Sequence, residues 1–181
     1  MSRRLRVATS TGCVGGVIMM ACLMVGATRA GVGWDSPLRW IVAFLGAEPT
    51  LVEAGQAQGG ISVPTIIAFG LAIHFATAIA FAWLFLRLME QLRGLFGWRL
   101  AAAGLVYGAA VWVIMTLVAL RLFDDVMYAR VQIFLPQTFF AAHLLFGAAL
   151  AACASLTREE SASPIPSPYR GILNLREDQP T

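Results

Sequence analysis

The stretch GLAIHFATAIAFAWLF, residues 70 to 85, decides the fold because it contains no aspartate, glutamate, lysine or arginine. It lies inside a longer uncharged window from Pro64 to Leu86, and a membrane-spanning helix needs about 20 such residues. Three other windows of this kind occur in the chain. The sequence therefore predicts an all-α membrane protein. Its four-helix transmembrane domain covers residues 1–157, with spans at about 8–28, 64–86, 100–120 and 136–157.

The composition supports a membrane protein. Hydrophobic residues make up 59% of the 181 residues and charged residues 13%, whereas a soluble domain has about 25% charged residues. Too few charged side chains are present to cover a water-facing surface. The net charge is +3, but the arginines flank the apolar windows and form no patch. We therefore expect the lipid bilayer as a partner and no nucleic acid.

The placement of arginine predicts the orientation in the membrane, because basic residues are retained in the cytoplasm. Arg3, Arg4 and Arg6 precede the first span, and the link between the second and third spans holds three arginines against one glutamate. The other two links hold four arginines with five acidic residues. Both termini are therefore predicted to be cytoplasmic, and the Pro- and Ser-rich residues 158–181 to be a disordered tail. A cleaved signal peptide remains an alternative for the first span.

A short apolar segment in the first link, DSPLRWIVAFLGAEP (35–49), predicts a further helix. Ser36 suits the N-cap, Pro37 suits the first turn, and the helix should end before Pro49. We expect a helix over residues 36–47 on the external side, where it lies in the membrane interface or tucks into the bundle.

The two halves of the chain resemble each other. When TGCVGGVIMM (11–20) is set over YGAAVWVIMT (107–116), Gly12 falls on Gly108, and His74 can likewise be set over His143. This pattern predicts two repeated helical hairpins, related by an axis along the membrane normal.

Small residues at four-residue spacing predict where the helices touch, because glycine lets two backbones approach closely in lipid. The second span carries Gly70, His74, Ala78 and Ala82 on one ridge, and the fourth carries His143 and Gly147 on another. Each histidine should therefore face a neighbouring helix and not the lipid. The predicted helix-packing glycines are Gly12, Gly16, Gly70, Gly104, Gly108 and Gly147.

The two histidines leave three interpretations open. They could be axial ligands of haem b held between facing helices. They could form a short proton or solute path. They could also be structural, each bonded to Thr77, Tyr107, Thr116 or a backbone carbonyl, and this is the interpretation that we favour. We therefore expect no cofactor, with haem b as the alternative.

Motifs that would indicate an enzyme are missing from the sequence, which has no P-loop, dinucleotide fingerprint, nucleophile elbow or metal-binding spacing. The sequence therefore favours a non-enzymatic protein. We expect an accessory subunit or scaffold that packs through its glycine and alanine faces, within a larger membrane complex or by self-association. A small transporter or proton-conducting protein that uses His74 and His143 is the alternative, followed by a haem b cytochrome.

Several stretches together resemble a group of small bacterial inner-membrane proteins for which no activity is established. They are SPLRWIVAFLG, a linker ending in QGG, GLAIHFATAIAFAWLF, AGLVYGAAVWVIMTLVAL and HLLFGAALAA. The resemblance covers roughly residues 10 to 155, and it departs slightly where glycine directly follows phenylalanine in HLLFG. It implies a four-span bundle with an external helix in the bacterial inner membrane, and it implies no activity.

Overall fold

The computed structural model describes residues 3–44, 62–92, 97–116 and 136–162, and these residues are almost entirely helical. Within these ranges, four helices are long and apolar enough to cross a bilayer: Arg4–Arg29, Val63–Gln91, Trp98–Thr116 and Pro136–Thr157. The prediction of an all-helical protein with four potential membrane spans is confirmed. This architecture suits a bilayer, where no water is available to the backbone, because a helix forms all hydrogen bonds between its own N–H and C=O groups.

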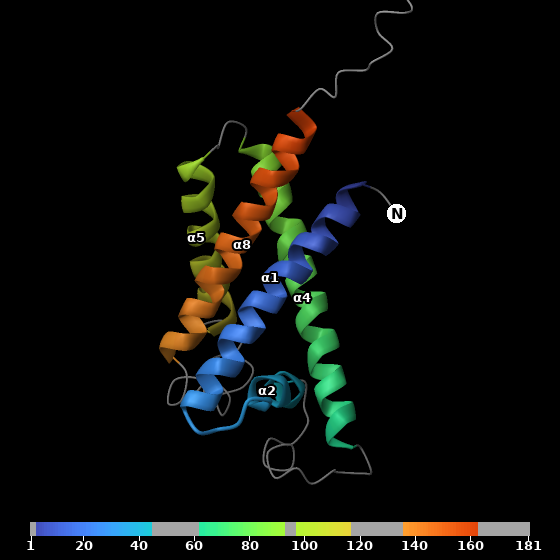
Figure 1. Cartoon of the computed structure of the whole chain (residues 1–181), viewed down its shortest axis with the longest axis vertical. Helices are drawn as coiled ribbons and strands as arrows, with labels where there is room; N and C mark the ends of the chain where they lie inside the picture. The colour runs from blue at the N-terminus through green and yellow to red at the C-terminus, as the bar shows by residue number, and fades with distance from the viewer. Residues whose placement is uncertain (1–2, 45–61, 93–96, 117–135, 163–181) are drawn as a thin grey trace, which may run out of the picture.

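The described helices are α1 (Arg3–Arg29), α2 (Ser36–Phe44), α4 (Val63–Gln91), α5 (Trp98–Val113) and α8 (Pro136–Ala162). Helix α1 packs against both α4 and α8, and α5 packs along α8 (Figure 1). The start of α1 and the end of α8 lie at the same end of the bundle, where α4 also ends and α5 begins. Helix α2 lies at the opposite end (Figure 1). The first and last described helices therefore begin and end, respectively, at the same end of the bundle (Figure 1).

Some helix boundaries differ from the sequence-based prediction. Helix α8 continues to Ala162, so residues 158–162 belong to the helix and not to the predicted disordered tail. These residues, REESA, include good helix formers, and nothing in their sequence breaks the helix where the apolar window ends. The rest of the predicted tail, residues 117–120 of the predicted third span, and residues 45–47 of the predicted external helix lie outside the described residues.

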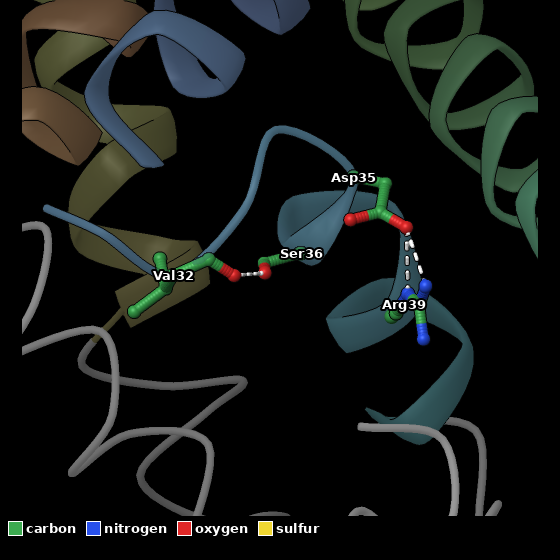
Figure 2. Close-up of polar contacts among 4 residues, drawn as sticks. All are labelled: Val32, Asp35, Ser36 and Arg39. Carbon is green, nitrogen blue, oxygen red and sulfur yellow. Dashed lines mark hydrogen bonds and ion pairs between the residues drawn. The ribbon is translucent and has the colours of Figure 1, made fainter. Parts of the chain in front are cut away.

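Helix α2 sits against the bundle, where it contacts α4 and α1. Leu38 is fully buried and Trp40 is 8% exposed, so the apolar face of this short helix is covered by protein. The expected N-cap is shifted, because the helix begins at Ser36 and the hydroxyl of Ser36 donates to the carbonyl of Val32 (Figure 2). Asp35 provides the backbone carbonyl that accepts from the amides of Leu38 and Arg39.

An ion pair joins α2 to the turn before it. The Arg39 guanidinium donates to Asp35 Oδ2 from Nε at 2.8 Å and from Nη2 at 2.6 Å (Figure 2). Both side chains are less than one-fifth exposed. Charge-assisted hydrogen bonds of this geometry are about twice as strong as neutral ones, so the pair holds the first turn of α2 in place.

The hydrophobic core lies in the half of the bundle toward the termini. Its largest members are Phe85 of α4 and Phe146 and Leu150 of α8, each no more than 1% exposed. They belong to a cluster that also contains Ala78, Ala82, Met89, Leu100, Ala151 and Ala154. Alternating small and large residues allow the phenyl rings to fill the space between helices that approach closely elsewhere.

Candidate functional site

His74 lies on the buried face of α4 and is 6% exposed. Its Nε2 lies 2.9 Å from the carbonyl oxygen of Gly16 on α1. Because a carbonyl only accepts, Nε2 carries the proton and donates. The residue four positions before it, Gly70, and the residue four positions after it, Ala78, are buried on the same face. The inward orientation that the sequence predicted is confirmed, and the imidazole links two helices.

His143 lies on α8 and is 1% exposed. Its Nδ1 donates to the carbonyl of Phe139 at 2.7 Å, one turn earlier in the same helix. The rings of these two residues also meet edge to face, with centroids 4.6 Å apart. The inward orientation of this side chain is confirmed as well. Its hydrogen bond is local, however, and joins no second helix.

The two imidazoles lie on different helices, His74 on α4 and His143 on α8. Each uses one ring nitrogen on a backbone carbonyl, and no hydrogen bond between His74 and His143 is seen. The ranges that the structure describes contain no group of three or more histidine, cysteine, aspartate or glutamate side chains placed to hold a metal ion. The three cysteines, Cys13, Cys22 and Cys153, are free and half-buried. The arrangement therefore consists of two separately anchored imidazoles.

The interface between α5 and α8 is built on three of the predicted glycines. A Cβ added to Gly108 would lie 2.2 Å from the His143 carbonyl oxygen, and one added to Gly104 would lie 2.4 Å from that of Gly147. A Cβ added to Gly147 would lie 2.0 Å from the carbonyl oxygen of Gly104. These neighbours are backbone atoms, which cannot rotate away. Only glycine allows the two helices to approach this closely.

Helix α1 has two glycine faces. Toward α4, an added Cβ on Gly12 would lie 2.6 Å from the Ile79 Cα, and one on Gly16 would lie 3.2 Å from Ala78. Toward α8, Gly15 faces Phe146, and Gly26 faces Thr138 at 2.2 Å. The sequence-based set missed Gly15 and Gly26, because a single glycine outside a four-residue spacing does not indicate which neighbour it meets. The two faces explain how α1 can pack between two helices.

The remaining predicted glycine, Gly70, contacts α2 and not another long helix. A Cβ at this position would lie 2.6 Å from the Leu38 carbonyl oxygen. The gap that Gly70 leaves in the surface of α4 therefore accommodates the backbone of α2.

The packing of the two hairpins does not follow the predicted repeat. In that alignment Gly12 corresponds to Gly108 and His74 to His143. However, Gly12 packs against Ile79, five residues after His74, whereas Gly108 packs against His143 itself. The two registers therefore differ by about one helical turn. The repeat also sets α1 over α5 and α4 over α8, so the contact between α1 and α8 should have a counterpart between α5 and α4. Instead, α1 packs along α8, while α4 and α5 have few close backbone approaches. The repeat remains a prediction from the sequence.

Tyr107 of α5 and Thr116, which follows α5, were expected only as possible partners of the histidines, and neither bonds to one. Tyr107 donates its hydroxyl to the Phe81 carbonyl on α4 at 2.7 Å, and its ring lies 5.1 Å from that of Phe85. Thr116, in a short π-helical turn that follows α5, is fully buried, and its hydroxyl has no hydrogen-bond partner among the residues that the structure describes. The signal for Tyr107 was present in the sequence, since a tyrosine within an apolar span needs an acceptor for its hydroxyl.

A ridge of small residues is exposed on the outside of the described helices. Ala68, Ala72, Ala76 and Ala80 follow one another at four-residue spacing along α4, and all four are exposed. We call this set the alanine ridge. The ridge contrasts with the outer faces of the other long helices, which expose larger side chains such as Val17, Val106 and Leu156.

Comparisons with models of protein families, with curated proteins and with solved structures give no match.

Proposed function

We propose that the protein is a non-enzymatic accessory subunit of a bacterial inner-membrane complex, with both termini in the cytoplasm. The observation that carries the proposal is the hydrogen bond from His74 to the Gly16 carbonyl. It commits the buried imidazole of α4 to holding α1, which is a structural use. Tyr107 is committed in the same way to the Phe81 carbonyl. These two side chains stabilise contacts between helices, as expected for a scaffold.

The surface that we assign to the partner is the alanine ridge of α4. The six predicted packing glycines face helices of the same chain, so they are occupied and do not serve a partner. The alanine ridge, in contrast, is a small-residue surface that remains exposed. We expect an apolar transmembrane helix of a different membrane protein to pack there, since small side chains allow the close approach on which helix association in lipid depends.

The test is purification of a tagged protein in mild detergent, followed by measurement of the mass of the complex. We expect a stoichiometric partner that is lost in the double variant Ala72→Leu/Ala76→Leu. The matched control is Val106→Leu, which enlarges a 69% exposed side chain on α5 and should retain the partner. A partner that survives the ridge substitutions would overturn the proposed surface. A complex whose mass is a multiple of 19.5 kDa would replace the accessory subunit with a self-associating scaffold.

The predicted orientation has its own test. A reporter that is active only in the cytoplasm should be active when fused to either terminus. Activity at one end alone would contradict an even number of membrane crossings.

A second candidate function is proton conduction through His74 and His143. The observation that favours it is the burial of both imidazoles inside the bundle, since imidazole is the side chain that exchanges protons near neutral pH. Protein in liposomes should then carry a proton flux that disappears in His143→Ala. Absence of flux in the parent protein would remove this candidate.

The residues do not fit haem b well. Haem iron is held by a ring nitrogen of each axial histidine. In His74, the Nε2 atom that projects farthest from the backbone already donates to Gly16. At the level of His143, α5 and α8 approach so closely that an added methyl group would collide with the backbone. We therefore expect purified protein to lack the visible absorption of haem. A Soret band that vanishes in His74→Ala would contradict this expectation.

A further inference from the structure

Two arginines from different helices contact the same glutamate at the end of the bundle where α1 begins and α4 ends (Figure 1). Arg4 of α1 places its Nε 3.7 Å from Glu90 Oε1, and Arg87 of α4 places Nη1 3.8 Å from Glu90 Oε2. The side chains are 68%, 48% and 48% exposed for Arg4, Arg87 and Glu90. We call these three residues the arginine pair site. It joins the first turn of α1 to the last turns of α4.

The arginine pair site carries a net positive charge. Two guanidinium groups, each with about five N–H donors, share one carboxylate. At 3.7 and 3.8 Å the contacts are long for charge-assisted hydrogen bonds. The site therefore retains both charge and donor groups for a second anion. Guanidinium groups bind the oxygens of phosphate in a fork geometry that suits this arrangement.

The backbone of α1 adds to the positive potential. The amino end of a helix has a partial positive charge and favours anions. The first turn of α1 has no acidic residue, and the sequence places Arg3, Arg4 and Arg6 there instead. An anion bound between Arg4 and Arg87 would stabilise both the side chains and the helix end.

Tryptophan places this site at the level of the lipid headgroups. The Arg87 guanidinium lies 5.2 Å from the ring centroid of Trp83, one turn earlier on α4. Trp83 is 45% exposed. At the start of α5, Arg99 lies over Trp98 in the same way, at 5.8 Å. Tryptophan concentrates at the boundary between hydrocarbon and water, and the phosphates of phospholipids lie at that boundary.

From these observations we propose that Arg4 and Arg87 bind the phosphate of an anionic phospholipid at the junction of α1 and α4. The headgroup phosphate accepts from both guanidinium groups, while the acyl chains lie against the apolar surface of the helices. Glu90 opposes the lipid charge and weakens the binding. This inference requires no partner protein and stands apart from the proposed function.

The test is lipid binding by the full-length protein in neutral detergent, measured by native mass spectrometry during titration with phosphatidylglycerol or phosphatidylcholine of the same acyl chains. We expect tighter binding of phosphatidylglycerol. A basic residue near an anionic lipid surface contributes about fivefold in affinity. Arg4→Gln and Arg87→Gln should therefore each weaken phosphatidylglycerol binding about fivefold, and the double variant about 25-fold.

Two further variants separate lipid binding from a structural effect. Glu90→Gln removes the competing carboxylate, so it should tighten phosphatidylglycerol binding, whereas loss of a merely structural ion pair would leave binding unchanged or weaker. Arg29→Gln, at the exposed far end of α1, should leave binding unchanged. Thermal unfolding of each variant checks that the fold is retained.

Three results would overturn the proposal. The first is equal binding of the two lipids by the parent protein. The second is unchanged phosphatidylglycerol binding in the folded Arg4→Gln/Arg87→Gln variant. The third is displacement of the lipid by millimolar inorganic phosphate, which would identify the site as one for a free anion.

Discussion

Replacement of Gly108 by alanine tests the closest helix contact in the bundle. The new methyl group would lie 2.2 Å from the carbonyl oxygen of His143 and 3.0 Å from its carbonyl carbon. Real Cβ contacts are essentially never shorter than 3.0 Å. Since the opposing atoms belong to the backbone of α8, no side chain can rotate to make room. The two helices must separate by about 0.8 Å along that line.

The size of the effect follows from two opposing terms. Overpacking a well-packed interface costs about 1–3 kcal/mol, and the gap opened along the rest of the interface adds lost dispersion contacts. Alanine in place of glycine in a helix recovers about 1 kcal/mol. We therefore expect Gly108→Ala to lower the free energy of unfolding by about 1–2 kcal/mol.

Thermal unfolding in detergent can measure this loss with a thiol-reactive fluorophore, because Cys13, Cys22 and Cys153 are free and half-buried. A loss of this size should lower the Tm by about 3–6 °C. The matched control is Gly15→Ala, whose methyl group would meet the ring of Phe146 at 2.9 Å. A ring can shift where a backbone cannot, so the control should unfold near the parent temperature. Gly108→Ala that is as stable as Gly15→Ala would refute the close packing of α5 on α8.

Four other substitutions test the polar contacts. Tyr107→Phe keeps the ring but loses the hydroxyl that bonds to α4, so the free energy of unfolding should fall by about 1 kcal/mol in the same thermal assay. His74→Ala removes the hydrogen bond between α4 and α1 and should lower the Tm more than Tyr107→Phe. The distance between labels attached to α1 and α4 should also increase in this variant. His143→Ala removes a bond within one helix, so the same α1–α4 distance should stay unchanged. Asp35→Asn weakens the ion pair of α2, and the amide hydrogens of α2 should exchange about tenfold faster; unchanged exchange would contradict a stabilising contribution from this pair.

The orientation of the histidines was predictable because it depends on local patterns. His74 lies between Gly70 and Ala78 at four-residue spacing, and a charged or polar group of this kind is costly when it faces lipid. Both conditions can be read along one helix, and both histidines are buried in the structure. The bonding partners were less predictable. A backbone carbonyl was among the expected partners, but which carbonyl depends on the neighbouring helix.

The glycines illustrate the same division. Four-residue spacing indicated that Gly104 and Gly108 pack against another helix, yet every long helix of this chain offers a small-residue face as a partner. Gly70 has the same spacing pattern and meets the short helix α2. The lone Gly26 meets Thr138 without any spacing signal. Partner choice therefore depends on the shape of the complementary surface, which is distributed over distant parts of the sequence.

The sequence by itself determined that the chain forms long apolar helices, roughly where they lie, and that both histidines face inward. These properties follow from hydrophobicity and spacing within one segment, because a backbone in lipid must satisfy its hydrogen bonds inside the helix. Only the tertiary structure decided that α1 packs between α4 and α8, that the two hairpins differ in register, and that Arg4 meets Glu90. Those properties depend on close contacts between residues far apart in the chain, where a shift of one helical turn changes every partner while leaving the hydrophobic pattern the same.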